Sequence, residues 1–306
     1  PPKFNFLNKP LICEDLLRAK RESKSKDIQR TTRNIFIEPS FEESIQILDH
    51  CLLIGRSGKT ISFDIEVVNG ELDCISFSWS PVESVSIPFK DWSGDYFTVD
   101  QELEVMRKIA EIIEDENISK VGANIIFDTQ FLFHKYGICP RGNIHCTQIA
   151  QKISYPDFPA GLDFVTTMYT DVPYYKQDGK QWMKMQSGTW QTWWNYNGMD
   201  SIIPSEAHPK QLKVLEKQGN IETYDRQRKL IKPLIYMSER GIRIDVAGMM
   251  RYKERQQNDL DKLVEELNRE VGHEINHNSP RQLMEYFYRE CNIKPYVNRK
   301  THKEST

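Results

Sequence analysis

Residues 60–66 read TISFDIE, and polar and apolar side chains alternate along the whole stretch. Because successive side chains of a β-strand point to opposite faces, the three apolar residues share one face, and Asp64 and Glu66 share the other. The apolar face predicts a strand near the centre of a sheet. Two carboxylates in a central strand are costly unless they are paired or bind a metal ion, and hard oxygen ligands suit Mg²⁺ or Mn²⁺. The stretch therefore predicts a buried sheet and a pair of candidate metal ligands.

The segments that follow predict how the sheet continues. Asn69-Gly70 is a strong signal for a two-residue hairpin turn, so the next strand should run antiparallel to the first. Further strands are predicted at 74–79, 85–89 and 120–123, and helices at 100–113 and 127–136. Three strands followed by a helix, a strand and a helix indicate an α/β fold, in which helices pack on a mixed sheet.

Two further acids lie where such a fold gathers side chains. Asp128, in NIIFD (124–128), falls where a predicted strand passes into a helix, at the edge where open α/β sheets build their sites. Asp200, in YNGMD (196–200), follows Tyr196 by one helical turn, so both side chains share a helix face. Each element alone also fits an ordinary role: a solvated D-x-E, a charge at a helix N-terminus, or an amphipathic pair.

Together, the four carboxylates and the tyrosine match the pattern of the DEDD exonucleases. The motifs read FDIE (63–66), GANIIFD (122–128) and YNGMD (196–200), and their tyrosine indicates the tyrosine subclass. The chain resembles the 3′→5′ proofreading exonuclease domain of family A DNA polymerases, the bacterial polymerase I type, and looks closest to phage-encoded members. The stretches 230–245 and 275–295 are similar to the first helices of the polymerase thumb. The resemblance stops where palm and fingers would begin, so we expect no polymerase active site in this chain.

The resemblance implies hydrolysis of a terminal phosphodiester by two ions of Mg²⁺ or Mn²⁺. The implied metal ligands are Asp64, Glu66, Asp128 and Asp200. Asp64 would bridge the two ions, and Asp128 would support the second one through water. Tyr196 would orient the attacking water, and Asn124 matches a family position that contacts the substrate strand.

The resemblance also implies a fold class and a domain organisation. The fold would be α/β, a ribonuclease H-like mixed sheet with flanking helices, followed by a helical C-terminal segment. We expect a basic arm or linker at 1–34, the exonuclease domain at 35–219 and the helical start of the thumb at 220–306. The implied partners are the 3′ end of a single DNA strand or of a primer, the missing polymerase domain and other replication proteins.

Composition excludes several classes of protein. The net charge is −3, from 41 basic and 44 acidic residues, so any nucleic-acid site must be local. The six cysteines form no C-x-x-C pair, which argues against a structural zinc site or a disulfide framework. Since no apolar run reaches membrane-spanning length and no signal peptide is evident, we expect no membrane partner and a cytoplasmic protein, in the bacterial host cell if it is phage-encoded.

Three features depart from simple patterns. Residues 171–195 hold four tryptophans without a clear period, and they fit either a packed aromatic-rich loop or a surface on which bases stack. Pro204 and Pro209 each remove a helical hydrogen bond, so the helix that carries Asp200 is predicted to kink or break soon afterwards. Cys146 stands where family members often have an aspartate.

Two other functions remain open. A ribonuclease D-like RNA 3′ exonuclease would share all four carboxylates, but it would carry a helical RNA-binding domain where this chain resembles a thumb. A non-catalytic DNA-binding module with a vestigial site is the other alternative, and the intact set of acids argues against it.

Overall fold

The computed structural model describes residues 9–27, 30–185, 189–298 and 304–305, which form two units, Pro1–Arg240 and Gly241–Thr306. The strands of the first unit are β1 (Asn34–Ile37), β2 (Ile61–Val68), β3 (Glu71–Ser80), β4 (Glu83–Pro88), β5 (Lys90–Asp91), β6 (Gly94–Asp95), β7 (Lys120–Gly122) and β8 (Ile144–Cys146). Its helices are α1 (Lys9–Glu22), α2 (Phe41–Arg56), α3 (Val99–Glu114), α4 (Ile125–Tyr136), α5 (Thr147–Ser154), α6 (Leu162–Tyr169), α7 (Lys176–Met185), α8 (Trp190–Gln218), α9 (Ile221–Arg228) and α10 (Ile231–Arg240).

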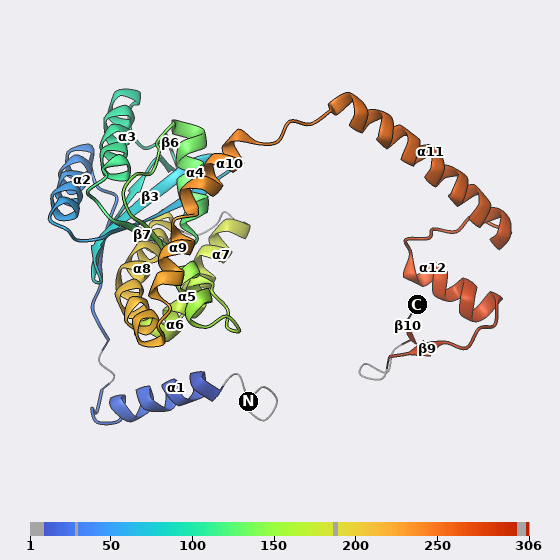
Figure 1. Ribbon diagram of the computed structural model, residues 1–306, viewed down its shortest axis with the longest axis horizontal. Helices are drawn as coiled ribbons and strands as arrows, with labels where there is room; N and C mark the ends of the chain where they lie inside the picture. Colours follow the sequence, from blue (N-terminus) through green and yellow to red (C-terminus); the bar gives the residue numbers. More distant parts are fainter. Residues whose placement is uncertain (1–8, 28–29, 186–188, 299–303, 306) are drawn as a thin grey trace. The chain divides into compact units, whose positions relative to one another are not determined.

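Six of these strands form one mixed sheet with the order β1-β4-β3-β2-β7-β8, and helices surround this sheet in Figure 1. The strands β2, β3 and β4 are antiparallel neighbours, whereas β1, β7 and β8 each join the sheet in parallel. The predicted mixed sheet with flanking helices is confirmed, and β2 lies in its interior. The three-residue β7 was predicted from its sequence, but β1 and β8, at four and three residues, were not, since neither shows an alternating pattern long enough to indicate a strand.

The predicted hairpin joins β2 to β3 at Asn69 and Gly70. Both residues have positive φ angles, 53° and 81°, which a type I′ turn requires and which Asn and Gly tolerate best. The pairing of the two strands then shifts between Glu66 and Val67, so Asp73 on β3 has no partner across the ladder. A β-bulge therefore begins directly after the second acid of β2.

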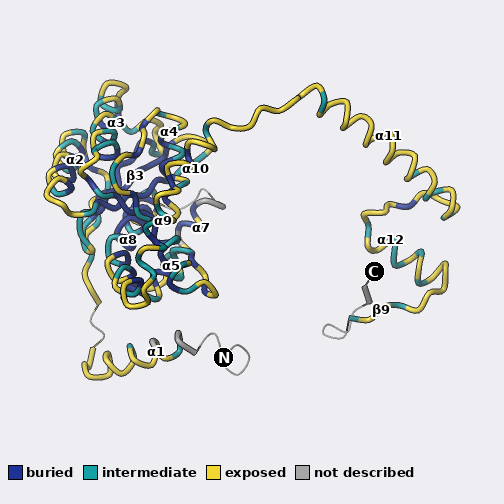
Figure 2. Tube along the Cα trace, viewed as in Figure 1, coloured by how far each residue is buried: buried dark blue, intermediate teal, exposed yellow. Residues whose placement is uncertain are grey.

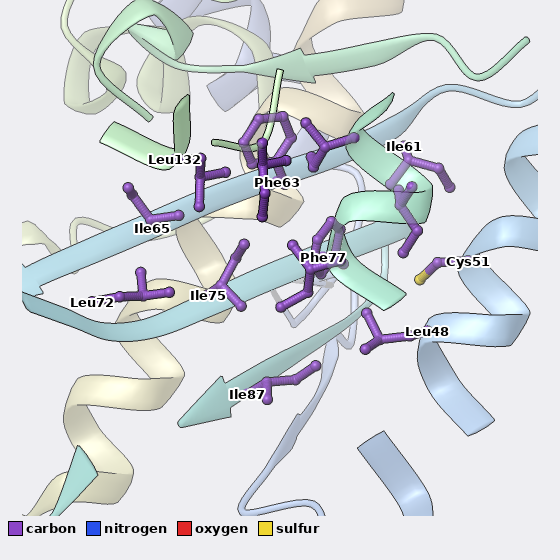
Figure 3. Packing of buried hydrophobic residues seen from close by; sticks show 14 of the residues in the cluster. Leu48, Cys51, Ile61, Phe63, Ile65, Leu72, Ile75, Phe77, Ile87 and Leu132 are labelled. Carbon is purple, nitrogen blue, oxygen red and sulfur yellow. The ribbon is translucent and has the colours of Figure 1, made fainter. Parts of the chain in front are cut away.

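One face of the sheet carries the apolar core of the unit (Figure 3). Phe63 and Ile65 of β2 and Phe77 of β3 belong to one buried cluster with Leu48 of α2 and Leu132 of α4. Full burial of side chains of this size stabilises a fold by about 1.5–3 kcal/mol each. The apolar half of the TISFDIE alternation thus fixes β2 in place, and it leaves the acidic half on the opposite face.

That opposite face is lined by small hydroxyl side chains, and the long helix α8 packs on it. Ser76 and Ser84 donate hydrogen bonds to the backbone carbonyls of Asn197 and Gly198, at 2.8 and 3.1 Å. Gly198 permits this close approach, because a Cβ there would lie 2.3 Å from a side-chain carbon of β1. The serine-lined face therefore holds α8, and with it Asp200, against the polar side of β2.

Helix α8 continues through both of its prolines to Gln218, so the predicted break after Asp200 does not occur, and the alternative of a kink stays a prediction. Pro204 is itself buried, together with Ile203 and Ala207, and α5 and α6 pack on this part of the helix. The burial of Pro204 and of its neighbours Ile203 and Ala207 offsets the missing backbone hydrogen bonds.

The tryptophan-rich stretch 171–195 forms α7 and the start of α8, and its residues 186–188 lie outside the described residues. Trp182 of α7 stacks on Trp193 of α8, with ring centroids 4.4 Å apart and planes 8° apart. Trp193 and its neighbour Trp194 are each 1% exposed. These three rings pack inside the unit, which favours the packed arrangement over a surface for stacking bases.

Two helices after Gly219 also contribute buried side chains, although Figure 2 draws most of their length as exposed or intermediate. Tyr224 of α9 is 1% exposed, and Ile231 and Ile235 of α10 belong to the same cluster as the core of the sheet. The predicted domain boundary at residue 219 stays a prediction, but the helices that follow it pack as part of the first unit.

The second unit consists of α11 (Val246–Val271), α12 (Pro280–Met284), a π-helical turn (Glu285–Glu290), and two short strands, β9 (Tyr296–Val297) and β10 (Glu304–Ser305). Most of its described apolar side chains are exposed, among them Leu263 and Phe287, whereas Ile275 is buried. None of the helices in the described ranges is both long and apolar enough to cross a membrane.

Candidate active site

Asp64 and Glu66 project from the polar face of β2, as their spacing predicts. Helix α8 packs on this polar face, and Asp64 is only 9% exposed. Asp200 approaches them from α8 and is 4% exposed. One oxygen of each carboxylate lies within 4.8 Å of the others. The fold thus brings together three acids that are up to 136 positions apart in the sequence.

Asn197 fixes the orientation of this group, and the sequence analysis missed it. Its side-chain Nδ2 donates to Oδ2 of Asp64 at 3.0 Å, and its Oδ1 accepts a hydrogen bond from Ser86 at 2.9 Å. The residue is fully buried. Helical spacing offered a signal, because residue 197 lies four after Trp193 and three before Asp200, on the helix face that packs on the sheet.

Burial is the dominant influence on the acids of the site. It raises the pKa of Asp64 and of Glu66 well above the ordinary carboxyl range, and the neighbouring carboxylates raise both further. A cation among these groups would reverse the effect, because it favours the ionised form of each carboxylate. The electrostatics of the group therefore favour a bound positive charge.

Asp128 lies outside the three-residue group, in the first turn of α4, where the sequence placed it. Its Oδ1 accepts a hydrogen bond from the backbone N–H of Ile65, at 3.0 Å, between the two acids of β2. Burial raises the pKa of Asp128 to about 7, although this hydrogen bond lowers it. The charge of Asp128 also raises the pKa of Asp64, so the two carboxylates act on one another.

Tyr196 lies beside Asp200, as its position one turn earlier predicts. Its ring stacks on Trp193, with centroids 5.5 Å and planes 1° apart. Burial, followed by the charge of Asp200 and of the acids on β2, raises the pKa of the Tyr196 phenol above its ordinary value. The phenol therefore keeps its proton, and it can donate a hydrogen bond within the acidic group.

Two residues of the 171–195 stretch also reach the site, and the sequence analysis did not single them out. Lys176 forms an ion pair with Oδ2 of Asp200, and its Nζ donates to the Tyr196 hydroxyl at 3.1 Å. Tyr175 donates a hydrogen bond to Oδ1 of Asp200. No sequence pattern links these residues to Asp200, because the contact depends on how α7 folds back on α8.

Asn124 is exposed at the junction of β7 and α4, within four residues of Asp128. It is the N-cap residue of α4 in a left-handed conformation, with a φ of 58°, and its side chain makes no capping hydrogen bond. The side-chain amide of Asn124 is therefore free of the helix and available to a ligand.

The donor set fits a divalent metal ion. Asp64, Glu66 and Asp200 offer only hard carboxylate oxygens, which Mg²⁺ and Mn²⁺ prefer. The single ammonium of Lys176 in contact with Asp200 shows that the site already accommodates a cation. Three carboxylates carry more negative charge than one ammonium neutralises, so their charge as well as their chemistry favours a divalent ion.

Several solved structures are similar in fold to this chain. The chain is similar to the polymerase domain of Pol1 from M. smegmatis, solved with a DNA primer-template and dNTP, with a TM-score of 0.59 and 16% identity over 90% of this chain and 43% of that chain. It is also similar to Brucella melitensis NrnC, with a TM-score of 0.50 and 17% identity over 69% of this chain and 94% of that one. Escherichia coli RNase D, described as an exoribonuclease involved in structured RNA processing, gives a TM-score of 0.49 and 16% identity over 68% of this chain and 51% of that one.

The Pol1 and NrnC structures support the fold, a ribonuclease H-like mixed sheet with flanking helices. No curated protein matches the chain. The family model DNA_pol_A_exo1, described as a 3′-5′ exonuclease, matches residues 40–215, which is more than half of the chain and includes all four predicted acids. The chain therefore belongs to this family of 3′-5′ exonucleases.

Proposed function

We propose that the chain hydrolyses the terminal phosphodiester of single-stranded or mismatched DNA 3′ ends, as the proofreading exonuclease of a DNA-directed DNA polymerase. The observation that carries the proposal is the buried group of Asp64, Glu66 and Asp200, with oxygens within 4.8 Å of one another. The similarity to the polymerase structure supports the polymerase context, because it covers 90% of the chain and so extends beyond the first unit, whereas the similarity to NrnC covers 69%.

The metal ligands in this proposal are Asp64, Glu66, Asp128 and Asp200. When bound there, two ions of Mg²⁺ or Mn²⁺ would supply an activated water and neutralise charge on the phosphate. Asn197 holds the carboxylate of Asp64 in one orientation through its hydrogen bond. Tyr196 keeps its phenol proton and donates it as a hydrogen bond that orients the attacking water. Asn124 offers its exposed amide to the substrate strand.

A buried site of this kind favours frayed ends over paired ones. The terminal nucleotide must leave its duplex to reach carboxylates that are less than a tenth exposed, such as Asp64 and Asp200. Unpairing costs a few kcal/mol, and a mismatched end has already lost most of that stabilisation. We therefore expect mismatched and single-stranded 3′ ends to be degraded faster than paired ones.

The test is degradation of a 5′-labelled DNA strand with Mg²⁺, and of an RNA strand of the same sequence. The Asp64→Ala/Glu66→Ala variant should lose activity by several orders of magnitude and still bind DNA. The matched control is Asp49→Ala/Glu111→Ala, which removes two carboxylates from the surface helices α2 and α3 and should leave the rate unchanged. Full activity of the first variant would falsify the assignment of the site.

Ribonuclease D-like activity on RNA is the alternative outcome of the same assay. Faster degradation of the RNA strand would assign the site to RNA 3′ ends and remove the proofreading role. Equal rates on a paired and a mismatched DNA 3′ end would also contradict proofreading, because the preference for a frayed end would be missing.

A further inference from the structure

A cation of the chain itself already lies in the acidic group. The Nζ atom of Lys176 is paired with Oδ2 of Asp200, bonds the Tyr196 hydroxyl at 3.1 Å, and lies 4.7 Å from the centre of the Tyr196 ring. The side chain of Lys176 is 12% exposed. Among the ion pairs of the described residues, no other basic side chain pairs with Asp64, Glu66 or Asp200. Lys176 is therefore the counter-ion of the group.

The residue before Lys176 occupies the other oxygen of the same carboxylate. Tyr175 donates its hydroxyl to Oδ1 of Asp200, so both oxygens of Asp200 are engaged by consecutive residues. A divalent ion at Asp200 would stand within a few ångströms of the ammonium of Lys176, and like charges at this distance repel strongly in a buried site. A metal ion therefore cannot bind Asp200 while Lys176 keeps its ion pair with that carboxylate.

The helix that carries Lys176 is tied to the site by aromatic contacts. Trp182 stacks on Trp193, and Gly179 lies against the ring of Tyr196, where an added Cβ would be 2.4 Å from Cε2. Tyr196 cannot give way easily, because its own ring stacks on the buried Trp193. Any movement that takes Lys176 away from Asp200 must therefore move α7.

We propose that Tyr175–Met185 is a lid that closes the acidic group when no metal is bound, with the ammonium of Lys176 in place of the metal ion. Metal binding and lid opening are then coupled. A metal ion displaces Lys176 and opens the lid, and a substitution that opens the lid strengthens metal binding. This inference rests on the proposed metal-dependent function. It adds that the closed protein withholds its carboxylates from substrate as well as from metal.

The first experiment measures Mn²⁺ binding to the full chain without nucleic acid, from the electron paramagnetic resonance signal of the free ion. Lys176→Met keeps much of the length of the side chain and removes its charge, and it should bind Mn²⁺ at least about tenfold more tightly, because a hydrogen bond to a charged group is lost from the competing closed state. Gly179→Ala should also tighten binding, since its added Cβ displaces α7 from Tyr196 without a change of charge.

The matched control is Lys108→Met, which removes a lysine paired with Asp49 on the surface at 2.7 Å and should bind Mn²⁺ as the unchanged protein does. Unchanged or weaker binding in Lys176→Met would overturn the lid, since it would mean that Lys176 does not compete with the metal. If neither the unchanged protein nor Lys176→Met binds Mn²⁺, the proposed function fails together with the lid.

Hydrogen exchange of the amides at 176–185 is the second measurement, because it reports on the lid and not on catalysis. Mn²⁺ should speed their exchange in the unchanged protein, and in Lys176→Met the exchange should be fast with or without the ion. Mn²⁺ that binds without any change in the exchange of these amides would refute the lid and leave the proposed function intact.

Discussion

Replacement of Asn197 by Ala should destabilise the first unit and disturb the acidic group at the same time. The substitution removes the hydrogen bond to the Asp64 carboxylate, at 3.0 Å, and the hydrogen bond from Ser86, at 2.9 Å. A hydrogen bond to a charged group contributes about 1.5–3 kcal/mol and a neutral one about 0.5–1.5 kcal/mol. Because Asn197 is fully buried, water cannot replace either bond, and the free energy of unfolding should fall by about 2–4 kcal/mol.

Urea unfolding followed by tryptophan fluorescence measures this loss. Trp193 and Trp194 are buried on the same helix, so the signal reports on the first unit. Asn195→Ala is the matched control: Asn195 is exposed on α8, and within the described part of the chain its side chain donates to the carbonyl of Gln191, at 2.8 Å. The control should lie within about 0.5 kcal/mol of the unchanged protein. A loss below 1 kcal/mol for Asn197→Ala would refute the role assigned to its two bonds.

Three further changes have defined outcomes. Tyr196→Phe keeps the ring and its stacking but removes the phenol O–H, so single-turnover cleavage should slow by roughly ten- to a thousandfold at unchanged metal affinity. Burial lowers the pKa of His145 to about 4 and of His208 to about 3, so only the unfolded chain takes up their protons just below pH 6.5. Relative to His145→Gln/His208→Gln, in which the buried acids titrate as before, the free energy of unfolding of the unchanged protein in urea should fall by about 1 kcal/mol per histidine between pH 6.5 and 5.5. A chain cut after Arg240 should keep the stability of the first unit. A cut after Gly219 removes three buried side chains, and the free energy of unfolding measured in urea should fall by more than about 4 kcal/mol.

Each of these outcomes has a control or a contradicting result. Tyr236→Phe alters an exposed phenol on α10 and should leave the cleavage rate unchanged. If Tyr196→Phe cleaves at the rate of the unchanged protein, the tyrosine packs without orienting water. A difference in the free energy of unfolding between the unchanged protein and His145→Gln/His208→Gln that stays flat from pH 6.5 to 5.5 would mean that the two histidines are not held neutral. Equal stability of the two truncated chains would mean that α9 and α10 do not stabilise the core.

The centre of the fold could be predicted because its signals are local. The alternation of TISFDIE and the Asn69-Gly70 turn determine β2, β3 and the faces of both strands within a dozen residues. The positions of the four acids follow from the same local patterns. The helix does not break at Pro204 because the packing of α8 against α5 and α6 outweighs the lost hydrogen bonds, and this packing is not visible in the local sequence.

The missed parts depend on contacts between distant segments. Lys176 and Tyr175 reach Asp200 only because α7 folds back on α8, and tryptophans on several sides of that stretch hide its helical period. Asn197 meets Asp64 across 133 positions. Short edge strands such as β1 (Asn34–Ile37) gain their stability from pairing with β4, which a four-residue window cannot show.

The left-handed backbone at Asn124 has a consequence for how that residue can be studied. A φ of 58° is strained for most side chains and is tolerated best by Gly, Asn and Asp, so the identity of residue 124 is constrained by the chain's path as well as by any ligand. An alanine at this position would mix two effects, a backbone penalty of about 1–2 kcal/mol and the loss of the amide. Glycine relieves the backbone and aspartate keeps the shape of the side chain, so this pair of replacements, and not an alanine scan, separates recognition from geometry. The same ambiguity would affect a comparison of natural sequences, where an invariant asparagine here could reflect the turn alone.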